Sequence, residues 1–360
     1  MNHKGSVFIL FLWVLLLLSF FAMSVGFRTR LAAKIEGYEL RRFEMNYDFL
    51  SAINLARFFI ESDKEPTVDF VGDDWYGTPE EFKSMDLAKR FELEISDEGS
   101  KIDLNKVSEQ FLLTFFGVLK KKGIKLETDP KDLTASILAW RGQTSLTGKA
   151  TSGFDQKGAP FQTIDELRTI QYISPHDVDV LMPFVTVYGT PFGGSMRVNI
   201  NTVHPYILEA LILQPGLIGG DFDKSTLLQQ IEALRNVKGK IKPMGKEKTE
   251  PSSKPSQAFQ QVDLDPNNFI QRLNLPYSIQ MVQLVSQLIS FVTIDSEFFS
   301  VHVRSKLPKK ESFVLDAVLG PRFVPRAQIQ GVPTSDSLGR PTGQPVTVPL
   351  EILAWQEGVA

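Results

Sequence analysis

The first 60 residues carry the longest hydrophobic pattern in the chain. Residues 6–27 contain no charged side chain. A helix of that length reaches roughly 33 Å, enough to cross a hydrocarbon core of about 30 Å. Residues 27–62 contain no proline and place apolar side chains three, four or seven positions apart, as on one helix face: Phe27, Leu31, Ile35, Tyr38, Met45, Phe49, Ala52 and Ala56. The pattern predicts one long helix that first spans a membrane and then becomes amphipathic.

Shorter patterns follow this helix. Phe91, Leu93 and Ile95 alternate with charged residues, and the alternation resumes after a turn at 96–100, which predicts a hairpin. Helical spacing or capping signals predict helices over 106–121 and 130–140, and helices that begin at 163, 175, 205 and 279. Further strands are expected at 185–187, 198–200, 291–306, 311–319 and 350–356.

The order of these elements suggests a divided chain. We expect a connection and the first strands over 63–105, a helical insert over 106–197, and a strand and helices that close it over 198–237. A low-complexity, flexible segment rich in Lys, Ser and Pro covers 238–260, and a helix and strands fill 261–360. Residues 100–105 and 195–202 both resemble a strand that ends in Asn and runs into a helix, which suggests an internal duplication.

Composition removes several classes of function. The 39 basic and 42 acidic side chains give a net charge of -3, so no electrostatic attraction to nucleic acid is expected. Residues 167–181 resemble a helix-hairpin-helix DNA module but lack its phosphate-binding glycines. The absence of cysteine excludes disulfides, thiol catalysis and iron-sulfur clusters. His3, His176, His204 and His302 lie far apart in the sequence, and no nucleophile elbow or phosphate-binding loop is present.

The N-terminus allows more than one interpretation. One interpretation of the apolar segment is a buried helix of a soluble protein, although no other helix here is so uniformly apolar. A secretory signal cut after Ala22-Met23-Ser24 would release a secreted or periplasmic binding protein. A cut between Gly5 and Ser6 would instead keep the helix on the mature chain. The short basic leader that ends in Gly5 resembles the leaders of type IV pilins and pseudopilins.

Seven segments, in order along the chain, carry a wider resemblance. They are the Gly5-Ser6 junction and residues 97–105, 137–141, 159–168, 185–189, 198–202 and 352–357. On these segments the chain resembles general secretion pathway protein K, the large minor pseudopilin of type II secretion systems. The resemblance implies a leader over 1–5, a membrane-spanning helix over 6–27 and a periplasmic continuation over 28–62.

The resemblance implies an α+β fold, in which a pilin-like long N-terminal helix and an antiparallel sheet are interrupted by a large, mostly helical insert. It also implies processing by prepilin peptidase and a single pass through the inner membrane with a large periplasmic domain. The expected partners are other minor pseudopilins, of the I and J types, at the tip of a pseudopilus, and no enzymatic reaction is implied. Lys4 before the span and Arg28, Arg30 and Lys34 after it favour the opposite orientation by charge alone, and we follow the resemblance.

Two groups of candidate site residues result. Leu10 stands where most pilin-like subunits carry glutamate, and the expected assembly face comprises Leu31, Ile35, Tyr38, Met45 and Phe49. Asp97, Glu98, Asp103 and Asn105 offer oxygen ligands around a glycine turn and are candidates for calcium, with an exposed polar hairpin as the alternative. A family member binds calcium in its helical domain, but here Gly142-Gln143-Thr144-Ser145 follows Trp140-Arg141 where relatives usually carry acidic residues. No cofactor is therefore certain.

Overall fold

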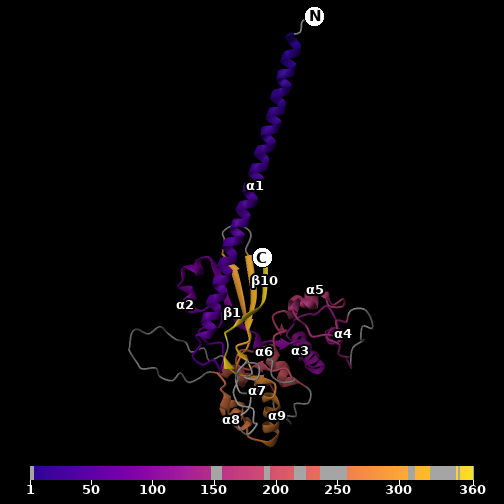
Figure 1. Ribbon diagram of the computed structural model, residues 1–360. Helices are drawn as coiled ribbons and strands as arrows, with labels where there is room; N and C mark the ends of the chain where they lie inside the picture. The colour runs from indigo at the N-terminus through magenta and orange to yellow at the C-terminus, as the bar shows by residue number, and fades with distance from the viewer. Residues whose placement is uncertain are drawn as a thin grey trace, which may run out of the picture. The chain divides into compact units, whose positions relative to one another are not determined.

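The computed structural model describes residues 4–146, 156–189, 195–214, 224–235, 258–306, 313–324, 346–347 and 349–359. The chain divides into two compact units, residues 1–55 and 56–360. The first unit consists of helix α1 (Lys4–Glu61), which continues for its last turns into the second unit (Figure 1). The predicted long N-terminal helix is confirmed. The predicted insertion over 238–260 lies mostly outside the described residues.

An antiparallel sheet forms one part of the second unit. Its strands are β1 (Phe91–Asp97), β6 (Phe299–Ser305), β7 (Phe313–Gly320) and β10 (Glu351–Val359), in that spatial order (Figure 1). Buried and more exposed residues alternate along β1 and β6, because successive side chains of a strand point to opposite faces. Trp75 packs edge-on against Phe299 on the buried face, at 5.0 Å between ring centroids. The strands predicted over 311–319 and 350–356 are confirmed as β7 and β10, whereas the one predicted over 291–306 is divided into β5 (Val292–Thr293), which belongs to another sheet, and β6.

The predicted hairpin at residues 91–104 is wrong. β1 pairs with β6, about two hundred positions away, whereas β2 (Ile102–Asp103) pairs in parallel with β3 (Val185–Thr186). Between β1 and β2 the chain forms the 3-10 turn η2 (Glu98–Ser100), which the Asp97 carboxylate caps by accepting a bond from the Gly99 N–H. This turn directs the chain out of the sheet, and long-range pairing of the apolar face outweighs the local pairing that alternation suggested.

A helical insert leaves the sheet after Asp97 and returns at Phe299, two residues that face each other in the β1–β6 pair. Its helices are α3 (Glu109–Lys121), α4 (Pro130–Trp140), α5 (Pro175–Leu181), α6 (Pro205–Leu213), α7 (Lys224–Arg235), α8 (Pro266–Arg272) and α9 (Ile279–Ile289). The 3-10 turns η3 (Ile164–Thr169) and η4 (Gln261–Leu264) also belong to it. Short helices α2 (Glu80–Lys83) and η1 (Asp86–Lys89) precede the insert, and strands β8 (Phe323–Val324) and β9 (Val346–Thr347) pair after it.

Local signals explain where these helices begin. Ser108, Asp129, Ser174 and Ser278 each accept a bond from a backbone N–H in the first turn, which satisfies one of the donors that a helix start leaves unpaired. The segment from Thr163 forms a 3-10 helix rather than an α-helix. One hydrophobic core runs from Val68 through Ile294. The predicted domain boundary at residue 261 does not coincide with this core, because Phe269, Leu284 and other residues of α8 and α9 belong to it.

The two halves of the insert contain matching strand pairs, as the suggested duplication predicts. The first half of the insert begins with β2 and ends with β3, and the second begins with β4 (Val198–Asn199) and ends with β5 (Val292–Thr293). Both pairs are parallel and both enclose several helices. The returning strands also match in sequence, Phe-Val-Thr-Val at 184–187 and Phe-Val-Thr-Ile at 291–294.

Matching hydrogen bonds support the duplication. The Asn105 side chain donates to the Phe161 carbonyl (3.0 Å) and accepts from the Phe161 N–H (2.7 Å). Asn201 makes the same two bonds to Phe259, at 3.2 and 2.7 Å. Each asparagine lies two residues after its strand and holds a distant segment beside the start of its own half.

Candidate functional site

Helix α1 is the candidate membrane span of the described chain. Among the described residues it is the one helix long and apolar enough to cross a bilayer, with a mean hydropathy of 2.7 in its most apolar window. Leu10 is exposed, as are its apolar neighbours. Gly5 and Ser6 lie in the first turn of α1, but their side chains are outside the described part, so cleavage between them stays a prediction.

The expected assembly face of α1 is only partly exposed. Leu31, Ile35 and Tyr38 are exposed. Met45 and Phe49, by contrast, are only 7% and 2% exposed. A side chain that is buried within its own chain is not available to a second subunit, so the face available for assembly differs from the predicted one over this half of the helix.

A second apolar stripe on α1 is exposed instead. Leu40, Phe43, Tyr47 and Leu50 are 60%, 58%, 58% and 43% exposed and follow each other at intervals of three, four and three residues. The Phe43 and Tyr47 rings meet edge to face, with centroids 4.9 Å apart. We call these four residues the exposed stripe. The sequence contained it, but α1 carries apolar residues on more than one side, and spacing alone does not tell which side becomes buried.

The calcium candidates are engaged by the protein itself. Asp97 is fully buried and accepts hydrogen bonds from the Gly99 N–H (2.6 Å), the Asn199 amide (3.1 Å) and the Thr202 hydroxyl. Glu98, also buried, pairs with Lys101 and accepts from the hydroxyls of Thr186 and Ser300. These bonds join the start of the insert to its returning strands.

The remaining two candidates cap local turns. Asp103 accepts from the Asn105 N–H at 2.8 Å, and Asn105 holds Phe161 as described above. In the described part of the chain, the carboxylates of Asp97, Glu98 and Asp103 do not form a group with oxygens within 4.8 Å of one another. Calcium binding by these residues stays a prediction, and their visible role is to fix the junction between sheet and insert.

A different carboxylate group lies beside this junction. Asp63, Asp69 and Asp73 place oxygens within 4.8 Å of one another. The Arg322 guanidinium, only 3% exposed, binds Asp69 at 2.8 Å and Asp63 at 3.1 Å, and donates to the Ile60 carbonyl at 2.9 Å. A cation therefore already holds two of the three carboxylates, and the group ties the end of α1 to the returning chain.

Burial makes the carboxyl groups of this region unusually basic. It raises the pKa of Asp73 to about 7 and that of Asp97 to about 6. It also raises the pKa of Asp69 well above its usual value, although the neighbouring Arg322 acts in the opposite direction. Glu297, where the chain returns to the sheet, has a pKa raised to about 8 by burial and by the charge of Asp295. In the folded protein, Asp97, Asp73 and Glu297 therefore change their protonation state between about pH 6 and pH 8.

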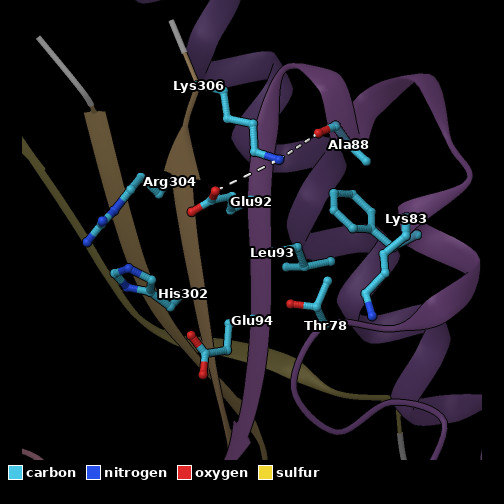
Figure 2. A pocket seen from close by; sticks show the side chains of 10 residues that line it. Thr78, Lys83, Ala88, Glu92, Leu93, Glu94, His302, Arg304 and Lys306 are labelled. Atoms are coloured by element: carbon cyan, nitrogen blue, oxygen red, sulfur yellow. Dashed lines mark hydrogen bonds and ion pairs between the residues drawn. The ribbon is translucent and has the colours of Figure 1, made fainter. Parts of the chain in front are cut away.

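A pocket of about 490 Å³ lies against β1 and β6. Lys306 lies between Glu92 and the Ala88 carbonyl (Figure 2). Its Nζ atom is 3.9 Å from the Glu92 carboxylate and 3.0 Å from the Ala88 oxygen. Lys83 pairs with Glu80 at 2.5 Å, and His302 pairs with Asp316, whose hydrogen bond raises the pKa of the imidazole. Most charged side chains of the lining are therefore paired with neighbours of the same chain. We interpret the pocket as a surface groove whose charges are largely satisfied within the protein.

Comparison with known proteins rests on the fold. No family model matches the sequence, and no curated protein matches it. A solved structure does: a chain of the crystal structure of the GspK-GspI-GspJ complex from the type 2 secretion system of enterotoxigenic Escherichia coli. The TM-score is 0.54 at 15% identity, and the match covers 89% of this chain and 98% of the other. The fold of this chain is therefore a pilin-like α+β arrangement, with a long N-terminal helix, a four-stranded antiparallel sheet and several helices between its strands.

Proposed function

We propose that this protein is a minor pseudopilin of the K type, a non-enzymatic subunit of a type II secretion pseudopilus in the inner membrane. The observation that carries the proposal is the structural similarity over 89% of the chain to a component of the GspK-GspI-GspJ complex. The 58-residue helix α1 supports it, because its apolar half is long enough for a bilayer and precedes a folded domain.

Assembly with smaller pseudopilins would use the exposed stripe of α1. Four large apolar side chains at helical spacing offer the kind of surface that an apolar face of a second helix can cover. Aromatic residues are enriched at such contacts because each buries a large area with little loss of side-chain entropy. The stripe, rather than the buried Met45 and Phe49, is the expected partner surface.

The test is complex formation between the full-length protein and its cognate smaller pseudopilins in detergent. Phe43→Asp places a charge in the centre of the stripe and should weaken the complex at least tenfold. Arg41→Asp is the matched control, because Arg41 is exposed on α1 but lies on a different side at about 100° per residue. Equal binding by both variants, or no complex with the wild-type protein, would contradict the assignment.

The placement that we propose, at the pseudopilus tip, is supported by residue 10. A glutamate in the bilayer costs on the order of 2.5 kcal/mol or more unless it meets a partner such as the terminal amine of the next subunit. A subunit with none above it has no use for the carboxylate, and this chain carries Leu10. We expect labelled protein only at fibre ends and no gain of assembly from Leu10→Glu; labelling along the shaft would refute tip placement.

A further inference from the structure

Charged side chains around the exposed stripe of α1 are sorted by sign. At about 100° per residue, Glu39 and Glu44 flank the middle of the stripe, about 60° to one side and about 80° to the other. Glu36 lies in line with the middle, one turn before the first residue of the stripe. Arg41 and Arg42 lie on other sides of the helix, about 120° or more from the middle. We call the three glutamates the acidic border.

The carboxylates of the acidic border are available to a partner. All three are exposed, and none forms an ion pair within the part of the chain that the structure describes. Arg42 follows Glu39 by three positions and Arg41 precedes Glu44 by three, a spacing at which ion pairs form on a helix, yet neither pair is made. The negative charge beside the stripe is therefore not neutralised by α1 itself.

The acidic border also lies outside the apolar half of α1. Glu36 comes nine residues after the uncharged run of residues 6–27, which is about 14 Å along the helix axis. A helix that crosses a bilayer with residues 6–27 thus carries the border and the stripe together on the aqueous side. There the carboxylates are charged near neutral pH and act on a partner through water.

We propose that the exposed stripe accepts an amphipathic helix of a smaller pseudopilin whose own apolar stripe is bordered by lysine or arginine. The apolar side chains supply the contact area, and the acidic border selects the partner, because charges at the margin of an interface act mainly on the association rate and on the choice of partner. A second copy of this chain fits poorly, because its stripe has the same acidic border and like charges would meet. The inference rests on the proposed function, since it names the chemistry of the partner assigned there.

The test measures the association rate of the full-length protein with its cognate smaller pseudopilins in a non-ionic detergent. Salt is raised from about 50 to about 300 mM, which shortens the screening length from roughly 14 to roughly 6 Å. Wild-type association should slow at least about threefold over this range. The triple variant Glu36→Gln, Glu39→Gln and Glu44→Gln should associate about three- to tenfold more slowly at the lower salt, and its rate should hardly depend on salt.

A matched control removes the same charge elsewhere. Three exposed acidic residues outside α1 are replaced together, in the triple variant Glu65→Gln, Glu81→Gln and Glu127→Gln. Both triple variants change the net charge by the same amount, but the control leaves the acidic border intact, so it should associate at the wild-type rate with the wild-type salt dependence. Thermal unfolding of both variants checks that each is folded.

The outcomes separate this inference from the proposed function. A complex that forms at the same rate and with the same salt dependence in the wild type and the α1 variant would overturn the acidic border and leave the proposed function standing. Equal slowing in the control would assign the effect to net charge, and faster association of the α1 variant would reveal an acidic partner; each would overturn the inference. Absence of any complex with the wild-type protein would overturn both.

Discussion

Replacement of Arg322 by Met should be among the most destabilising single changes in the unit formed by residues 56–360. The guanidinium pairs with the fully buried Asp69 and with Asp63, and it donates to backbone carbonyls at the end of α1. Methionine fills similar space but leaves the Asp69 charge without its partner. Removing one member of a buried pair costs about 3–5 kcal/mol, equivalent to a fall in Tm on the order of 10 °C.

A double-variant cycle isolates the pair. Asp69→Asn in the Arg322→Met background removes the uncompensated charge, so at least half of the lost stability should return. The assay is urea unfolding of the purified full-length protein in detergent, followed by tryptophan fluorescence, because Trp75 lies buried beside Phe299 in this region. If Arg322→Met lowered the free energy of unfolding by less than about 1 kcal/mol, well below the range expected for a buried pair, Arg322 would not be what holds the cluster together.

Three further predictions follow from the same contacts. Carboxyl groups whose pKa is raised in the folded state take up protons on folding, so stability should rise as the pH falls from 9 to 6 through the pKa values of Glu297, Asp73 and Asp97. Thermal unfolding of the wild type and of Glu297→Gln at several pH values tests this. An unchanged dependence of stability on pH in the variant would contradict it. Asn105→Ala and Asn201→Ala each leave both backbone groups of a phenylalanine unpaired and should each cost about 1–3 kcal/mol in urea unfolding. Asn267→Ala is the nearly neutral control, because Asn267 is an exposed position of α8 whose side chain accepts a bond from the exposed Tyr277 hydroxyl. Gly5→Leu should block removal of the leader, seen as an unshortened mass, and normal processing would argue against prepilin peptidase.

Much of the fold could be read from the sequence because its signals are local. The uncharged run and the proline-free stretch after it predicted α1, and Ser or Asp caps followed by apolar spacing predicted α3, α4, α5 and α9. The similar segments 100–105 and 195–202 suggested the duplication, and each contains a strand of a matching parallel pair. Each of these features depends on residues that lie within one or two turns of each other.

What sequence reasoning missed depends on distant partners. The alternation of Phe91, Leu93 and Ile95 showed a strand but not that its partner is β6, beyond the whole insert. The exposed stripe and the buried face of α1 share the same spacing, so only the fold distinguishes Phe43 from Phe49. Arg322 gave no signal at all, because it becomes notable only when folding brings Asp63 and Asp69 to it.

The central claim is that this chain is an assembly subunit anchored by its own N-terminal helix. The mature N-terminus tests it most directly, by N-terminal sequencing and intact mass of the protein purified from membranes. The account predicts that the chain begins at Ser6 and keeps the apolar half of α1. A mature chain that begins near Val25 would contradict it, because the released protein would have lost the segment that holds it in the membrane.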